Sequence, residues 1–144
     1  MTDDALRRTT RTLAVLGIGV AGYLTYIHYA GLTPVCGISH GCETVQTSRN
    51  ATLLHTPVAL FGLITYALVL ATSFSRGERA LLSGFALTVT AFAFSVYLTY
   101  RELFTIHAIC SWCVSSAIIF TLLAIVATAR LTTRRPAAAV LPTA

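Results

Sequence analysis

The chain has 144 residues, of which 56% are hydrophobic and 10% are charged, and its mean hydropathy is +0.76. A soluble domain carries about 25% charged residues, so the composition excludes that class and predicts a small membrane protein that crosses the bilayer several times. The net charge of +5 comes from ten arginines, and because no basic run is interleaved with aromatic residues, nucleic-acid binding is also excluded.

Four apolar segments have the roughly 17–25 residues that a membrane-spanning helix needs. They are residues 13–30, 57–74, 80–100 and 110–131. We therefore predict an all-α membrane protein, a bundle of four transmembrane helices in a membrane domain of residues 13–131. A long loop, residues 31–56, separates the first two segments, whereas the other connections are short. The flanking segments are residues 1–12, of which the first ten are expected to be disordered, and a disordered tail of residues 132–144.

The arginines predict the orientation of this bundle. With the N-terminus in the cytoplasm, eight arginines lie on the inner side and two on the outer side, which is a strong positive-inside bias. The inner ones are Arg7, Arg8, Arg11, Arg76, Arg79, Arg130, Arg134 and Arg135, and the outer ones are Arg49 and Arg101. Both termini are then cytoplasmic, and all four cysteines and all four histidines face the oxidising, extracytoplasmic side.

The first segment also resembles a cleaved signal peptide, because Arg7, Arg8 and Arg11 precede an apolar stretch. Its length exceeds the 7–15 residues typical of such a stretch. In addition, the sequence Tyr-Leu-Thr-Tyr at residues 23–26 recurs at residues 97–100, and in each copy a cysteine follows ten residues after the second tyrosine. This repeat favours a retained first helix that corresponds to the third.

One cysteine pair, Cys110 and Cys113, lies at the start of the fourth segment. Positions i and i+3 share a helix face, and the first turn of a helix offers unpaired N–H groups and the positive end of the dipole, which lower a thiol pKa. The spacing is typical of disulfide exchange, of half a zinc site, and of two buried apolar side chains. Taken alone, the motif leaves these alternatives open.

The second pair, Cys36 and Cys42, lies in the outer loop, where Gly37 and Gly41 let the backbone fold back sharply. A loop pair and a helix pair on one membrane face are the layout expected of a thiol relay. Oxidation of a dithiol needs a two-electron acceptor, and the chain has no nucleotide, flavin or haem-attachment motif. A quinone dissolved in the membrane is the natural candidate.

A wider set of residues resembles the bacterial homologues of vitamin K epoxide reductase, over about residues 10–131. The shared pattern consists of Cys36, Cys42, Val45, Ser48, Pro57, Gly62, Tyr66, Cys110 and Cys113. The resemblance implies a four-helix bundle around a quinone, ubiquinone or menaquinone, with the first loop lying over the site. It implies that Cys110 and Cys113 are the active-site pair with Cys113 next to the quinone, that Cys36 and Cys42 are the shuttle pair, and that Ser48 lies near the active site.

Two positions depart from the animal members of this family, which contact the quinone through a tyrosine and an asparagine. Here the corresponding residues are Ala117 and Val58, so the hydrogen bonds to the quinone must differ. Many bacterial members carry a fused thioredoxin-like domain, for which this chain is too short. The resemblance therefore implies a separate, soluble thioredoxin-like (DsbA-like) partner outside the bacterial inner membrane.

Three functions from different classes follow. The first is a quinone-dependent thiol oxidase that keeps an extracytoplasmic thioredoxin-like protein oxidised. The second is a metal-binding or metal-transfer membrane protein that uses the four cysteines with His40 or His107, although the Cys36–Cys42 spacing is wide for a zinc site. The third is a structural protein with inert disulfides. Among enzymes, the other bacterial type of quinone-linked oxidase is an alternative, but its C-x-x-C lies in the first outer loop.

Other polar and aromatic residues near the outer surface have two interpretations each. Trp112 is either an interfacial anchor or a quinone contact. His28 and His55 either relay a proton or reach the lipid headgroups. Glu43 and Glu102 are expected to be solvated loop charges.

Electron transfer between the two pairs requires a mixed disulfide. We expect Cys110, at the mouth of the helix, to be the more exposed thiol of its pair, with Cys113 one turn deeper. A mobile loop reaches the mouth more easily, so the predicted bridge joins Cys42 to Cys110 and leaves Cys36 to meet the partner.

Overall fold

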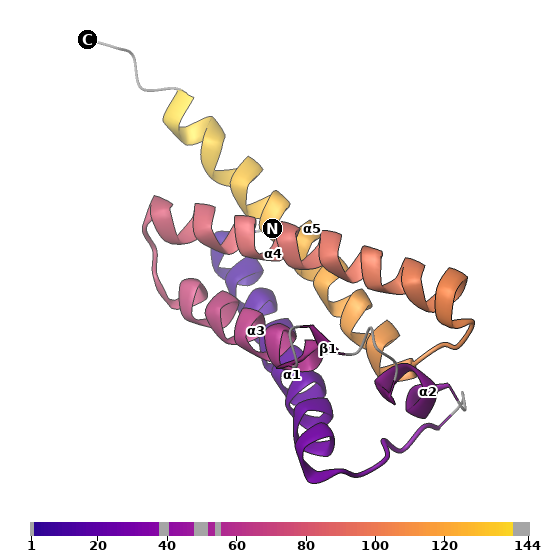
Figure 1. Cartoon of the computed structure of the whole chain (residues 1–144). Helices are drawn as coiled ribbons and strands as arrows, with labels where there is room; N and C mark the ends of the chain where they lie inside the picture. The colour runs from indigo at the N-terminus through magenta and orange to yellow at the C-terminus, as the bar shows by residue number, and fades with distance from the viewer. Residues whose placement is uncertain (1, 38–40, 48–51, 54–55, 140–144) are drawn as a thin grey trace.

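The computed structural model describes residues 2–37, 41–47, 52–53 and 56–139 (Figure 1). The helices are α1 (Asp3–Ala30), α2 (Cys42–Thr47), α3 (Val58–Phe74), α4 (Glu78–Arg101) and α5 (Ser111–Ala139), and a π-helical segment, η2 (Glu102–Ile106), continues α4. Two short antiparallel strands, β1 (Thr52–Leu53) and β2 (Thr56–Pro57), precede α3. The long helices pack together, with α1 against α3 and α5, and α4 against α5 and α3.

Three stretches are long and apolar enough to cross a membrane: α1, α4 together with η2, and α5 up to Arg134. The apolar helix α3 has 17 residues and is shorter than these. Large apolar side chains remain exposed along the outside of the bundle, among them Leu16, Ile64, Phe94 and Ile125. Helices whose outward faces are apolar as well as their inward faces are suited to a lipid environment. The structure therefore confirms the prediction of a helical membrane protein.

The centre of the bundle is built around Tyr66 of α3, which is fully buried. Its ring stacks on Phe120 of α5 at a centroid distance of 4.1 Å, and its hydroxyl lies 2.9 Å from the Ser116 hydroxyl. On α1 the ring lies where a side chain at Gly17 would be, so any Cβ there would collide with it. These contacts tie α1, α3 and α5 together directly beside the cavity described below.

Arginines close one end of the bundle. Arg7 donates to the Ser73 carbonyl through Nε at 3.1 Å and Nη2 at 2.8 Å, and thereby caps the C-terminus of α3. Asp3 accepts from Arg130 at 3.4 Å and from Arg134 at 2.7 Å. These contacts connect the start of α1 to the end of α5.

Both flanking segments differ from the expectation of disorder. The helix α1 starts at Asp3, because Thr2 caps it and Arg7 has a binding partner on α3. The helix α5 continues to Ala139, whereas a disordered tail is predicted from residue 132. Residues 140–144 lie outside the described part of the chain.

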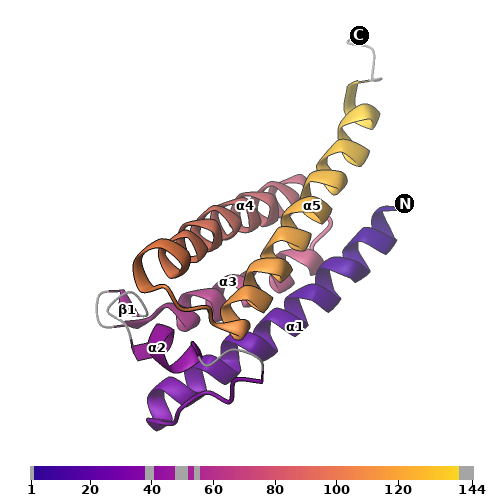
Figure 2. The same cartoon turned by 90° about the vertical axis from the view of Figure 1, so that its right-hand side faces the viewer.

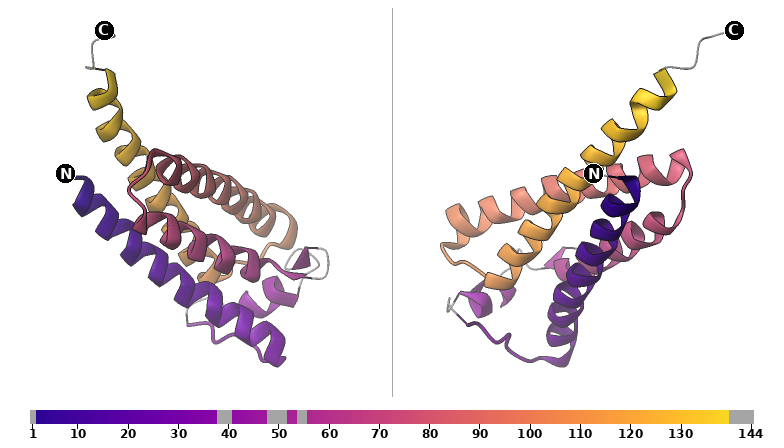
Figure 3. Two further views of the ribbon diagram at one scale, coloured as in Figure 1. Left: turned by 90° about the vertical axis from the view of Figure 1, so that its left-hand side faces the viewer. Right: turned by 180° about the vertical axis from the view of Figure 1, so that it is seen from behind.

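The cysteines lie at the opposite end from this arginine cluster. Figure 2 shows the N-terminus and the end of α5 at one side, and α2, β1 and the start of α5 at the other. The two views in Figure 3 show the same separation. The cluster formed by Arg7, Arg130 and Arg134 thus lies at the end of the bundle opposite to the cysteines, which agrees with the charge bias in the sequence.

Candidate redox site

A sharp turn brings the chain from η2 into α5. His107 has a left-handed backbone conformation (φ 53°) that ends η2, and a short linker, residues 107–110, leads to Ser111. Cys110 therefore occupies the position just before the helix. The Val114 N–H donates to the Cys110 carbonyl at 3.0 Å, which makes Cys110 the N-cap residue of α5.

The sulfur of Cys110 acts as the capping group. It accepts the backbone N–H of Cys113 at 3.4 Å, where a serine or aspartate oxygen would accept in an ordinary cap. A side-chain hydrogen bond from Cys113 lowers the pKa of the Cys110 thiol to about 7, and burial opposes this effect without cancelling it. Neither thiol is in a disulfide, and Cys110 is placed to act as the nucleophilic thiolate at neutral pH.

Cys110 is completely buried, contrary to the prediction that it is the more exposed thiol of its pair. It lies under α2, in a cluster with Cys42 and Val45. The reason is a close approach of backbones: a Cβ on Gly41 would lie 2.5 Å from the carbonyl oxygen of Ile109, so only glycine lets α2 settle on the linker before α5. The loop thus covers the helix pair rather than meeting it at an open mouth.

The loop pair, Cys36 and Cys42, is joined in a disulfide with a Cα–Cα distance of 6.2 Å. The Cys42 sulfur lies 3.6 Å from the Ser111 hydroxyl, which is next to Cys110 in the chain. Cys36 packs at the edge of the same cluster and is partly exposed. This arrangement brings all four cysteines together, with Cys42 as the inner and Cys36 as the outer member of the loop pair.

Trp112 holds the segment before the loop disulfide. Its indole N–H donates to the Val35 carbonyl at 2.9 Å, and its ring lies on Tyr23 of α1 at 4.7 Å. The Val35 N–H in turn donates to the Tyr23 hydroxyl at 3.3 Å. Trp112 does not line the cavity next to the cysteines, so it fixes the loop rather than contacting a ligand there.

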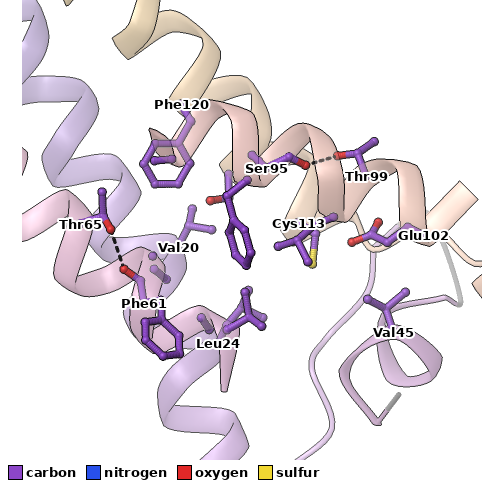
Figure 4. Close-up of a pocket in the computed structure, with 18 of the residues that line it drawn as sticks. Val20, Leu24, Val45, Phe61, Thr65, Ser95, Thr99, Glu102, Cys113 and Phe120 are labelled. Atoms are coloured by element: carbon purple, nitrogen blue, oxygen red, sulfur yellow. Dashed lines mark hydrogen bonds between the residues drawn. The ribbon is translucent and has the colours of Figure 1, made fainter. Parts of the chain in front are cut away.

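A mostly apolar cavity of about 140 Å³ lies between the helices on the inner side of the cysteines (Figure 4). Its walls come from α1, α3, α4 and α5, and from Val45 of α2. Among the lining residues are Leu24, Phe61, Phe94, Cys113 and Phe120. An apolar cavity of about 150 Å³ is large enough for a benzene ring. This cavity therefore accommodates the ring of a quinone, with the Cys113 sulfur in the wall beside it.

Several of the polar groups in the cavity wall lie at its cysteine end, whereas Thr65 lies at the other. Figure 4 shows the Cys113 sulfur and the Glu102 carboxyl facing the same space, with Ser95 and Thr99 beside them on α4. The Thr99 hydroxyl donates to the Ser95 carbonyl at 3.0 Å. The Ser95 hydroxyl makes no hydrogen bond within the described residues, and it is therefore available to a bound carbonyl oxygen.

Glu102 is the largest departure from the sequence expectation. It was predicted to be a solvated loop charge, but its exposed fraction is only 6%. Its Oε2 accepts the backbone N–H of Cys110 at 3.5 Å, and its carboxyl faces the Cys113 sulfur at the same end of the cavity. Glu43, by contrast, is exposed on α2 as expected.

Three predicted positions, Ser48, His40 and His55, lie outside the described residues. His28 lies next to Tyr29 at the end of α1 and does not line the cavity. Within the described ranges no three His, Cys, Asp or Glu side chains are grouped closely enough to hold a metal ion. No observation of the described residues therefore favours the metal-binding alternative.

The geometry can be compared with known proteins. No curated protein matches the chain significantly. The family model described as the vitamin K epoxide reductase family matches residues 9–128, which include both cysteine pairs and all four long helices in large part. Members of this family are membrane-embedded thiol–disulfide oxidoreductases that use quinones. The chain therefore belongs to the vitamin K epoxide reductase family and is an oxidoreductase with a quinone-linked thiol redox function.

Proposed function

We propose that this protein is the quinone-dependent oxidase of an extracytoplasmic, thioredoxin-like (DsbA-like) protein in a bacterial inner membrane. The catalytic cysteines are the loop pair, Cys36 and Cys42, and the helix pair, Cys110 and Cys113. The observation that carries the proposal is the placement of these thiols: Cys42 shares a buried cluster with Cys110, and Cys113 lines the cavity behind it.

The electron path follows from these contacts. The dithiol of the partner attacks Cys36 and reduces the loop disulfide, and the partner leaves with its own disulfide formed. Cys42 then attacks Cys110 of the oxidised helix pair, and Cys36 resolves this mixed disulfide, so that the loop disulfide returns and the helix pair becomes a dithiol. The observed state, with a loop disulfide and no disulfide between Cys110 and Cys113, is the product of this step.

A quinone supplies the two-electron acceptor that this cycle needs. The Cys110 and Cys113 thiols give up two electrons and two protons and close their disulfide, and the acceptor leaves as the quinol. The Ser95 hydroxyl, in the cavity wall near Cys113, is the donor that we assign to a quinone carbonyl. It takes the part played by the tyrosine and asparagine of the animal enzymes, since Ala117 does not line the cavity and Val58 carries no polar group.

The proposed membrane arrangement has four spans, in which α3 spans the membrane in addition to α1, α4 and α5. Although α3 is short, it is apolar and packs between α1 and α4. Both termini are then cytoplasmic and the cysteines are outside. In intact cells reduced with a permeant thiol, a membrane-impermeant maleimide should label Cys36, which is the partly exposed cysteine of the loop. Labelling that appears only after lysis would contradict this orientation.

The decisive experiment measures quinone reduction by the purified protein with two donors, a thioredoxin-like protein and a small dithiol. Cys36→Ala and Cys42→Ala should abolish oxidation of the protein donor and leave slow oxidation of the small dithiol, which bypasses the loop. Cys110→Ala and Cys113→Ala should abolish both reactions. Equal losses in all four variants with both donors would refute the relay.

A further inference from the structure

The structure points to a proton-handling residue in addition to the four cysteines. Oxidation of a dithiol by a quinone transfers two protons as well as two electrons. The proton of Cys113, which lines the apolar cavity, needs a carrier, because water that could accept it there is largely excluded. The inference below rests on the proposed quinone reduction and adds a residue to it.

We propose that Glu102 is a catalytic residue that accepts the proton of the Cys113 thiol as the helix pair is oxidised, and passes it to the nearer oxygen of the quinone. In the balanced step, Cys110 and Cys113 lose two electrons and form one S–S bond. The Cys113 proton moves through Glu102, and the carboxylate is regenerated. The Cys110 proton leaves to the external water, from which the second quinone oxygen is protonated.

The first argument is position. Glu102 begins η2, the π-helical continuation of α4, and this widened turn places its carboxyl in the cavity wall. The carboxyl and the Cys113 sulfur line the same end of the cavity, so the carboxyl is placed to accept the thiol proton. Figure 4 shows the two groups facing each other at the same end of the cavity.

The second argument is that the other titratable groups around the cavity cannot carry the proton. The titratable residues that line the cavity, within the described part of the chain, are Arg101, Glu102 and Cys113. Cys110 faces Glu102 from the linker through its backbone N–H. An arginine stays protonated in proteins and cannot accept the proton. Of these groups, Glu102 is therefore the one besides the thiols that can both take up and release a proton.

A structural role alone does not explain why residue 102 carries a carboxyl group. Its hydrogen bond with the backbone N–H of Cys110 is long, at 3.5 Å, and a neutral amide oxygen could accept it equally well. Burying a carboxyl group with a single long backbone contact costs stability unless the group has another use. The variant Glu102→Gln keeps the shape and the acceptor oxygen but removes the exchangeable proton, so it separates the two roles.

The first measurement is the rate of quinone reduction with a small dithiol as donor. For Glu102→Gln we expect a loss of about 100-fold or more in kcat, in the range typical of a general acid–base group, with little change in KM for quinone. The residual rate should rise with pH, since hydroxide replaces the missing base. Glu102→Asp, which keeps the carboxyl, should restore part of the rate. Glu43→Gln, which removes an exposed carboxyl on α2, is the matched control and should behave as the wild type.

The second measurement needs neither quinone nor turnover. Infrared difference spectra between the dithiol and disulfide states of Cys110 and Cys113 should contain a change in a carboxyl C=O band, because the protonation or hydrogen bonding of Glu102 changes with the sulfur. This band should be absent in Glu102→Gln and present in Glu43→Gln. Formation of the Cys36–Cys42 disulfide in each variant shows that the site has folded.

The outcomes separate the two proposals. If the wild type fails to reduce any quinone but shows the carboxyl band, the proposed function is wrong and the coupling of Glu102 to the thiols stands. If Glu102→Gln reduces quinone at the wild-type rate, or if the wild type lacks the carboxyl band, the assignment of Glu102 is refuted whatever the acceptor is.

Discussion

The contact between α2 and the linker before α5 gives the sharpest prediction for the transfer between cysteine pairs. At Gly41 a Cβ would lie 2.5 Å from the Ile109 carbonyl oxygen and 2.8 Å from the Ile109 nitrogen. Ordinary contact begins near 3.4 Å, so Gly41→Ala must push α2 outward by roughly 0.9 Å, the difference between 3.4 Å and 2.5 Å. Both obstacles are backbone atoms, and neither can rotate away.

This displacement acts directly on the reacting sulfurs, because Cys42 is the next residue in the chain. A misplacement of about 1 Å can slow a reaction that depends on alignment by about 100-fold. We expect Gly41→Ala to reduce the rate of Cys42–Cys110 bridge formation by about this factor. The helix α5 and the part of the cavity wall that the long helices form should be unaffected, so that Cys113 remains beside Glu102.

The assay uses a background in which Cys36 and Cys113 are both serine, because neither resolving thiol then remains and the Cys42–Cys110 disulfide accumulates. Its rate of formation under a fixed oxidant is measured by quenching with a maleimide reagent and peptide mapping. The matched control is Gly37→Ala, in the same loop, where a Cβ would meet nothing within 4 Å. Equal rates for the two alanine variants would refute the argument, and an absence of the bridge in the parent would refute the Cys42–Cys110 route itself.

Further predictions concern single side chains. The ultraviolet thiolate absorbance of Cys110, measured as the difference from Cys110→Ser, should rise with pH through a midpoint at about 7, since the hydrogen bond from Cys113 lowers the pKa of the Cys110 thiol. A midpoint near the ordinary value of about 8.5 would contradict the capping role. Tyr66→Phe should lower the free energy of unfolding by about 1–3 kcal/mol because Ser116 loses its buried partner, and unchanged thermal stability in detergent would count against this. Tyr23→Phe should speed hydrogen exchange of the Val35 amide about fivefold, because this N–H loses its hydroxyl acceptor and a hydrogen bond of about 1 kcal/mol. Trp112→Phe should leave oxidation of a small dithiol unchanged, whereas a loss of quinone reduction would place Trp112 in the cavity.

Much of the architecture depends on local features of the sequence and can be predicted from them. Apolar runs of span length define the membrane helices because a bilayer core leaves no alternative for an unbroken apolar stretch. The arginine distribution places Cys36, Cys42, Cys110 and Cys113 at one end, and the structure has them together there. The spacing of these cysteines, with Tyr66 and Gly62, also carries the family resemblance that the family model confirms.

The tertiary structure decided which surroundings each group has, because burial depends on segments that are distant in the chain. Glu102 is polar and close to an arginine, so local rules make it a surface charge. The packing of η2 against α2 and the approach of Cys110 to its carboxyl enclose it. Cys110 is at a helix mouth by sequence but is buried because Gly41, nearly seventy positions away, lets another backbone rest on its linker. In the same way Arg7 extends α1 to Asp3 by binding the end of α3. A sequence pattern determines what a segment can bury, and the contacts between segments determine what it does bury.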